Sequence, residues 1–303
     1  MKIGIQVPEV EYVIPWVELR RMVETAERIG LDSIWVGDHL LYRGDGRPER
    51  GPWEAWATLA AVAAVTERVE IGPLVASTSF HNPAILAKQA ATIDEISGGR
   101  LVLGLGAGWN EAEYRAFGIP FDRRVSRFEE AFTIIRTLLR DGRCDFDGAF
   151  YQARDAALLP RGPRTAGPPL MVGSMGERML AITLPHVDAW NAWFTWFGNS
   201  VEGYRALRDR IDAACTAAGR DPGSVERTVA LFVAFPGAQG RQLGDLTRPE
   251  IPAIPHDPAI LSRTLRAFAA EGIGHVQLVL DPITTETVAA LEPTLRLLGA
   301  ETA

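Results

Sequence analysis

The sequence predicts a single (β/α)8 barrel domain spanning residues 1–303, with insertions in the loops that follow its strands. Short apolar runs alternate with helix-period segments from one end of the chain to the other, and eight strand–helix pairs can be counted. No shift in composition marks a second domain, although 303 residues would accommodate two. An open, doubly wound sheet is the alternative arrangement, and the count of eight favours the barrel.

The first half of the chain holds four predicted strands. They are expected at residues 2–7, 33–37, 69–75 and 101–105. Helices are expected at residues 16–29, 53–65, 83–96, 111–117 and 124–140. The first helix repeats apolar residues on one face and stops at Gly30. The third begins at Pro83, a residue favoured in the first turn, and the last has regular helical spacing of its apolar residues.

The second half continues the alternation after an irregular insertion. Residues 142–169 are rich in Gly, Pro and Arg and are expected to form no regular element. Strands are expected at residues 170–172, 187–190, 227–235 and 275–280. Helices are expected at residues 177–183, 201–218, 259–270 and 285–298, with a Pro- and Gly-rich loop at residues 236–257.

The composition is that of a soluble globular enzyme. Hydrophobic residues make up 47% of the chain, which is enough for a well-buried core. The net charge of −7 argues against binding to nucleic acid or to an anionic membrane surface. No apolar run is long enough to span a bilayer, and residues 1–8 lack a signal-peptide pattern. The two cysteines, Cys144 and Cys215, predict no disulfide framework, so a cytoplasmic protein is expected.

A glycine-rich corner follows the fourth strand. Gly104, Gly106 and Gly108 allow the backbone to approach a flat or anionic ligand closely, and Asn110 can cap the helix that follows. A tight turn that needs positive φ angles explains the same pattern without a ligand. The other strand ends of this chain favour the functional interpretation, because ligand sites of such barrels gather where strands end.

The second strand ends in Asp38 and His39. A neutral imidazole beside a carboxylate can exchange a proton near pH 7, and the carboxylate can orient it or hold a cofactor group. A structural Asp–His pair is the alternative, which the position at a strand end disfavours. At the third strand, Gly72 and Pro73 predict a bulge that forms a shelf for a flat ring. His81 is expected to shape the loop before the next helix.

Two further strand ends carry ligand-binding signals. Gly173, Ser174, Met175 and Gly176 precede a helix and suit a phosphate, although a simple glycine turn competes. Trp190 and Asn191 are expected at the rim of a pocket for a planar ligand. The neighbouring aromatic residues, among them Trp193 and Trp196, fit a pocket wall or the core equally well.

Other common active-site patterns are missing from the sequence. His186, His256 and His275 are scattered without metal-ligand spacing, and no His-Glu-x-x-His pattern occurs, so no metal site is expected. No Gly-x-Ser-x-Gly elbow occurs either, which argues against a serine hydrolase of that type.

Taken together, these segments resemble the bacterial luciferase-like monooxygenase superfamily, and most of all its deazaflavin-dependent oxidoreductases. The resemblance rests on GLDSIWVGDH at residues 30–39, HNPAILAKQA at 81–90, SGGRLVLGLGAGWNE at 97–111, GSMG at 173–176 and DAWN at 188–191. As a set these segments are specific to the superfamily, and much less specific to one cofactor or substrate. Members are often dimers, so the resemblance allows a homodimer.

The resemblance implies a barrel that holds FMN or the 5-deazaflavin coenzyme F420 at the carboxyl ends of its strands. Asp38 and His39 map beside the ring. The family's strand-three bulge, often with a cis peptide bond, maps onto Pro73, Leu74 and Val75. Phosphate contacts map onto Ala107, Gly108, Gly173, Ser174, Met175 and Gly176. Deazaflavin sugar-phosphate dehydrogenases carry an acidic residue where this chain has Trp109, a departure that argues against that particular chemistry, with Glu9 and Glu11 as the candidate replacements.

The predicted function is therefore hydride transfer between coenzyme F420 and a small organic substrate. His39 would exchange the accompanying proton, and Trp109 and Trp193 would contact the substrate. Residues 41–52 and 236–257 are predicted substrate lids. One alternative is a monooxygenase that uses oxygen and reduced FMN from a separate reductase. A second alternative is a non-catalytic flavin-binding barrel.

Overall fold

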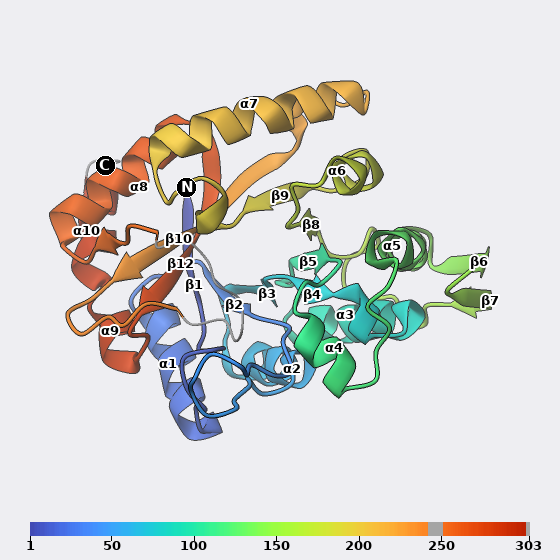
Figure 1. Cartoon of the computed structure of the whole chain (residues 1–303), viewed down its shortest axis with the longest axis horizontal. Helices are drawn as coiled ribbons and strands as arrows, with labels where there is room; N and C mark the ends of the chain where they lie inside the picture. Colours follow the sequence, from blue (N-terminus) through green and yellow to red (C-terminus); the bar gives the residue numbers. More distant parts are fainter. Residues whose placement is uncertain (242–250, 301–303) are drawn as a thin grey trace.

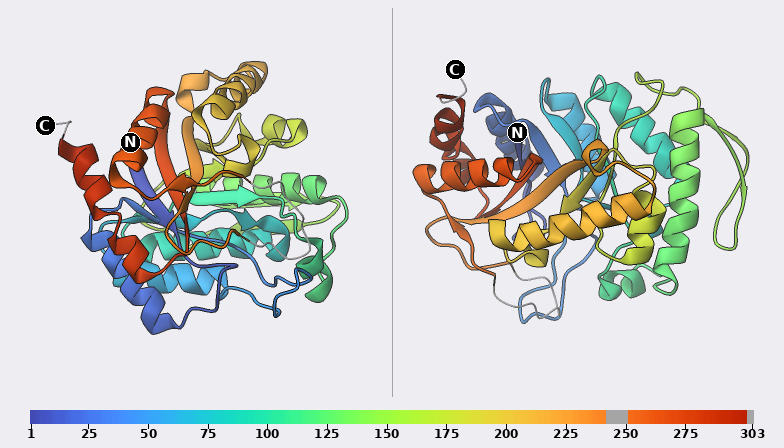
Figure 2. Two further views of the ribbon diagram at one scale, coloured as in Figure 1. Left: turned by 60° about the vertical axis from the view of Figure 1, so that its left-hand side comes forward. Right: turned by 90° about the horizontal axis from the view of Figure 1, so that it is seen from above.

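The computed structural model describes residues 1–241 and 251–300 and shows a parallel β-barrel surrounded by helices (Figure 1; Figure 2). Hydrogen bonds join the strands in the order β3-β2-β1-β12-β10-β9-β8-β5-β4. Their bounds are β1 (Lys2–Gln6), β2 (Ser33–Val36), β3 (Glu70–Pro73), β4 (Ala76–Ser77), β5 (Leu103–Gly106), β8 (Leu170–Val172), β9 (Ala189–Ala192), β10 (Glu226–Ala234) and β12 (Ile273–Asp281). The predicted (β/α)8 barrel is confirmed.

The third barrel strand is broken into β3 and β4. Its first half closes the barrel through a parallel bridge between Ile71 and Leu101, where the Val102 N–H donates to the Ile71 carbonyl at 2.8 Å. Its second half pairs with β5. Between the halves, the peptide bond from Leu74 to Val75 is cis. The bulge expected from the sequence is present, and these two residues fix its register.

The helices wrap the outside of the barrel, as Figure 1 shows. Their bounds are α1 (Trp16–Arg28), α2 (Ala55–Val65), α3 (Pro83–Ile96), α4 (Glu111–Ala116), α5 (Arg124–Asp141), α6 (Glu177–Thr183), α7 (Val201–Ala217), α8 (Pro258–Ala270), α9 (Thr285–Ala289) and α10 (Glu292–Ala300). Side-chain oxygens cap several of them; the Asn82 side chain, for example, accepts the Ala84 and Ile85 N–H groups at the start of α3. Among the helices of the described residues, none is long and apolar enough to cross a membrane.

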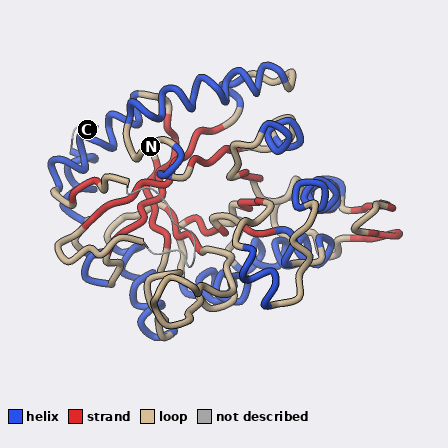
Figure 3. The backbone as a smooth tube through the Cα atoms, in the orientation of Figure 1, coloured by secondary structure: helices blue, strands red, loops and turns tan. Residues whose placement is uncertain are grey.

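The sequence predicted no regular element in residues 142–169, and this prediction is wrong. The insertion contains an antiparallel hairpin, β6 (Arg143–Asp147) and β7 (Gln152–Ala157), which projects beside α5 (Figure 3). The Glu130 carboxylate on α5 accepts the N–H groups of Ala149, Phe150 and Tyr151 at 2.8–2.9 Å and so fixes the turn. This contact joins residues far apart in sequence, so the local composition did not reveal it.

Two other segments differ from the predicted elements. The closing helix is divided into α9 and α10, because Pro293 has no N–H group to continue a helix and is tolerated only in its first turn. The predicted loop 236–257 contains a short strand, β11 (Ile254–Pro255), paired with β10. Residues 242–250 of that loop lie outside the described residues.

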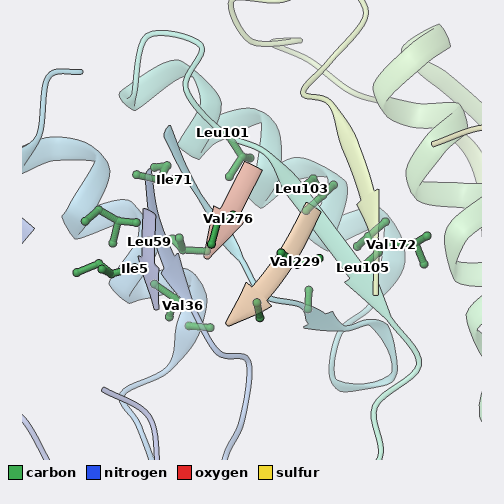
Figure 4. Packing of buried hydrophobic residues seen from close by; sticks show 14 of the residues in the cluster. Ile5, Val36, Leu59, Ile71, Leu101, Leu103, Leu105, Val172, Val229 and Val276 are labelled. Atoms are coloured by element: carbon green, nitrogen blue, oxygen red, sulfur yellow. The ribbon is translucent and has the colours of Figure 1, made fainter. Parts of the chain in front are cut away.

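Apolar side chains form the core on both faces of the barrel. The larger cluster lies between strands and helices, and Figure 4 shows members such as Leu59, Ile71 and Leu103. A smaller cluster fills the barrel itself and consists of Trp35, Leu74, Met171 and Ala189.

A buried histidine near the amino ends of the strands makes the fold sensitive to acid. His275 Nε2 lies 2.7 Å from Ser33 Oγ, which accepts a hydrogen bond from Trp35 Nε1 at 2.7 Å. Burial, aided by the positive charges of Lys2 and the N-terminus, lowers the pKa of His275 from 6.5 to about 3. Below pH 6.5 the unfolded chain therefore binds a proton that the folded chain does not.

We therefore expect the free energy of unfolding to fall as the pH drops from about 6.5 toward 3, with this histidine contributing at most about 1.4 kcal/mol per pH unit. Urea unfolding of the wild type and of His275→Gln at neutral and mildly acidic pH measures this contribution. The variant should show the smaller loss of stability over that interval. Equal losses in the two proteins would contradict the assignment.

Candidate active site

The principal cavity of the described residues, with a volume of about 340 Å³, opens at the carboxyl ends of the barrel strands. Most of the site residues predicted from the sequence line it. They are Asp38, His39, Leu74, Val75, Ala107, Gly108, Trp109, Gly173, Ser174, Met175, Asn191 and Trp193. The structure therefore brings together residues from five strand ends.

Three predicted residues do not line the cavity. Trp190 is fully buried on the outer face of β9, because successive side chains of a strand alternate and Asn191 faces inward. Its indole N–H donates to the Ser174 carbonyl at 2.8 Å and supports the cavity wall from behind. Pro73 ends β3, and Gly176 precedes α6 with its N–H 3.4 Å from Ser174 Oγ.

Asp38 connects two strand ends instead of contacting its neighbour His39. Its Oδ2 accepts the Ser77 N–H at 2.8 Å and lies 2.9 Å from His81 Nε2. Asp38 is buried, so these contacts fix the end of β2 to β4. The predicted orientation of His39 by Asp38 has no hydrogen bond to support it, and the predicted role of His81 in shaping the loop agrees with this contact.

His39 lies between two other carboxylates. Its Nδ1 is 2.8 Å from Glu113 Oε1, and its Nε2 is 3.8 Å from Glu9 Oε1. The rings of Tyr42 and Trp109 flank it, with centroids 5.1 Å from the imidazole. The side chain of His39 is only 16% exposed, which leaves a small accessible part facing the cavity.

The charged neighbours of His39 and Glu9 shift the pKa values of both side chains. Burial alone would lower the pKa of His39, but the carboxylates of Glu9 and Glu113 outweigh it and raise that pKa above 6.5. Burial alone would raise the pKa of Glu9, but the charges of His39 and Arg241 and a hydrogen bond from the Tyr42 hydroxyl lower it below 4.5. The contacts therefore favour the charged forms of both His39 and Glu9 over the neutral forms.

Several cavity residues could not be found from the sequence pattern. They are Gln6, Ser77, Glu113, Met179 and Arg241, together with Glu9 and Trp196, which had no definite role, whereas Gly106 belongs to the predicted glycine corner. Glu113 lies in a short helix rich in polar residues, yet its side chain is buried. Arg241 lies in the loop after β10, where its Nε donates to Glu11 Oε1 at 2.7 Å.

The glycine corner after β5 includes a residue with positive φ and also lines the cavity. Gly108 has φ +70°, and a Cβ there would lie 2.0 Å from the Tyr114 hydroxyl and 2.4 Å from Ser77 Oγ. Asn110 was expected to cap α4, and that prediction is wrong: its side chain makes no capping hydrogen bond, and its amide donates to the Leu41 carbonyl at 3.0 Å instead.

The cavity has features that fit a flat ring with a phosphate-bearing tail. Gly106 and Gly173 keep the space above Val75 open, because a Cβ on either would lie 2.8 or 3.3 Å from its methyl groups. Arg124 donates to the Gly108 carbonyl at 3.1 Å and Arg210 to the Met175 carbonyl at 2.8 Å, so a cation stands beside each expected phosphate loop.

One polar atom in the cavity lacks a protein partner. Gln6 is 2% exposed, and its Nε2 donates to Glu9. Its carbonyl Oε1 is buried and accepts no hydrogen bond within the described residues. Because a buried unpaired acceptor is costly, this atom is suited to a donor on a bound molecule.

The two predicted lids differ in their relation to the cavity. No residue of 41–52 lines it, although Tyr42 contacts Glu9. Among the described residues of 236–257, Arg241 lines the cavity, and the Gln239 and Gly240 N–H groups donate to Asp281 at 2.9 and 2.6 Å. Movement of either loop stays a prediction.

Comparisons with known proteins agree with this architecture. A family model described as luciferase-like monooxygenase matches residues 1–237. An F420-dependent glucose-6-phosphate dehydrogenase of Amycolatopsis mediterranei is 32% identical over 222 residues, covering 69% of this chain and 62% of that protein. A pyrimidine monooxygenase of Cronobacter sakazakii is 34% identical over 176 residues, covering 56% of this chain and 51% of that protein.

A solved structure extends the similarity to nearly the whole chain. An F420-dependent secondary alcohol dehydrogenase in complex with an F420-acetone adduct superposes with a TM-score of 0.81 at 19% identity, covering 98% of both chains. At that identity the likeness concerns the fold. The chain spans about 60% of the length of the first curated relatives it matches.

Proposed function

This chain belongs to the luciferase-like monooxygenase family, and we propose that it is an oxidoreductase, as the relatives with that activity suggest. From that premise we propose that it uses coenzyme F420 to transfer a hydride to or from a small organic substrate. We also propose that residues 1–303 act as one domain in the cytoplasm. The observation that carries the proposal is that His39, whose pKa is raised by nearby carboxylates, lines the same cavity as the Leu74–Val75 bulge.

Each part of the cavity has a role in this proposal. When bound, the deazaflavin supplies the hydride chemistry, and the protein supplies placement and exclusion of water. Leu74 and Val75 form the shelf under the ring. The Ala107–Gly108 and Gly173–Met175 backbones, with the predicted help of Gly176, hold the phosphate. Pro73 and Trp190 support these walls from behind, and Asn191 offers an amide.

The substrate would occupy the open side of the cavity. Trp109 and Trp193 line that space and suit an apolar or planar molecule. His39 exchanges the proton that accompanies the hydride. Asp38, which binds Ser77 and His81, contributes negative charge near the imidazole and is available to the cofactor.

An FMN-dependent monooxygenase supplied by a separate reductase is the second proposal, and the pyrimidine monooxygenase relative supports it. The same shelf and phosphate loops accept a flavin. A non-catalytic barrel is less well supported, because burying His39 between two carboxylates has a cost that binding alone does not require.

A binding titration distinguishes these proposals. Purified protein is titrated with oxidised F420 and, separately, with FMN, and quenching of tryptophan fluorescence is measured. Three of the eight tryptophans line the cavity, so binding should be visible. We expect micromolar binding of F420 and at least tenfold weaker binding of FMN. The reverse order would support the monooxygenase, and no binding of either would contradict both proposals.

A further inference from the structure

Glu113 is a buried carboxylate whose two oxygens have different partners. It comes from α4 and is 0% exposed. Its Oε2 accepts the backbone N–H groups of Leu40 and Leu41 at 2.8 and 3.3 Å. Its Oε1 lies 2.8 Å from His39 Nδ1. The Glu113 side chain thus binds both the Leu40–Leu41 backbone and the imidazole ring of His39.

The division of these contacts argues against a purely structural role. The loop backbone needs only acceptors, and Oε2 supplies both of them. Within the described residues, the hydrogen bond of Oε1 is to His39. A residue that merely anchored the loop would not need to present a second oxygen to a ring nitrogen at hydrogen-bond distance.

The chemistry of a carboxylate fixes which nitrogen carries the proton. An ionised carboxylate only accepts hydrogen bonds, so Nδ1 must be the donor in this contact. We propose that Glu113 is the positioning residue of the active site: it holds His39 with the proton on Nδ1 and leaves Nε2 as the atom that exchanges a proton with the substrate. This assignment rests on the proposed function of His39.

The groups around the imidazole agree with this division. Nε2 faces Glu9 Oε1 at 3.8 Å, beyond direct hydrogen-bond distance, so it is not consumed by a protein partner. Asp38 adds negative charge near the imidazole. The positive charge of Arg241, 3.5 Å from Glu9 Oε2, partly offsets the negative charge of Glu9. The ring of Tyr42 covers one side of the imidazole. The closest ionic partner is therefore Glu113.

The test is an NMR titration of His39 in the protein without cofactor, using ¹⁵N shifts that report the tautomer and the pKa. The wild type should show the Nδ1–H form when neutral and a pKa above that of a free histidine. In Glu113→Gln the carboxamide oxygen can still accept the two loop N–H groups, but its NH₂ group then faces Nδ1. The neutral ring should switch to the Nε2–H form, and its pKa should fall by about one unit or more.

Glu9→Gln is the matched control, because it removes a negative charge from the other side of the ring. It should lower the pKa of His39 without changing the tautomer. Glu113→Asp, which keeps the charge, should restore the Nδ1–H form and also serves if the glutamine variant fails to fold. A Glu113→Gln protein that folds with an unchanged tautomer, or a Glu113→Asp protein that lacks the Nδ1–H form, would overturn the proposal.

The same variants separate this inference from the proposed function. Measurement without cofactor depends only on the chain itself. If the tautomer switches in Glu113→Gln but the wild type binds neither F420 nor FMN, the positioning role stands and the proposed function fails. In an active enzyme, Glu113→Gln should reduce kcat by at least tenfold and shift its pH profile, with little change in cofactor Kd.

Discussion

Replacement of His39 by asparagine is expected to reduce turnover by about 10²- to 10⁴-fold, the range typical of general acid–base groups. Asparagine retains an N–H donor for Glu113 but cannot exchange a proton. The side chain is largely buried between Glu9 and Glu113 and faces the cavity, so nothing else in the described residues supplies the same atom at that place. Steady-state F420 turnover measures the loss, with a substrate found by screening neutral alcohols and ketones.

The matched control is His186→Asn, because His186 is exposed and does not line the cavity. That variant should retain full turnover, and both variants should bind F420 within a few-fold of the wild type. Unchanged turnover in the His39 variant would indicate that another group moves the proton, or that the barrel only binds its cofactor.

The pH dependence follows from the raised pKa of His39. For oxidation of an alcohol the imidazole must be neutral to accept a proton, so kcat should increase as the pH rises through this raised pKa. For reduction of a ketone it must be protonated, so kcat should decrease over the same interval. Both transitions should lie above pH 6.5 and should vanish in His39→Asn.

The second large effect is expected at Gly108. Gly108→Ala would place a Cβ 2.0 Å from the Tyr114 hydroxyl, which donates to the Ala107 carbonyl at 2.8 Å and lies 3.0 Å from Ser77 Oγ. Displacing this buried hydroxyl would disturb two residues of the cavity wall at once. We expect at least tenfold weaker F420 binding and a free energy of unfolding lower by about 2–4 kcal/mol.

Gly118→Ala provides the control, because Gly118 has nearly the same backbone angle, φ +69°, and no atom within 4 Å of an added Cβ. It measures the cost of the positive φ alone, about 1–2 kcal/mol, and should leave F420 binding unchanged. Urea unfolding and the fluorescence titration give both quantities. Equal effects of the two substitutions would show that the contact with Tyr114 is unimportant.

Local patterns predicted the helices and barrel strands closely, and they failed where distant residues decide. The apolar runs that became β2 and β8 must be buried on both faces, and that requirement is visible in the sequence. The β6–β7 hairpin depends on Glu130, which no local pattern connects to the turn it binds. Trp190 and Asn191 were both expected at the rim of the pocket, but successive side chains of a strand alternate, so only Asn191 faces the cavity.

The sequence by itself determined that the chain forms a barrel, that its candidate site residues lie at the strand ends, and that His39 is among them. The reason is that periodicity, glycine corners and strand-end positions are local properties of the chain. Only the tertiary structure decided which carboxylate contacts His39. Adjacent in sequence, Asp38 binds Ser77 and His81, whereas Glu113, 74 residues away, binds the imidazole. Side chains of neighbouring residues diverge at the end of a strand, and packing of a later helix against the barrel brings in a partner that sequence separation conceals.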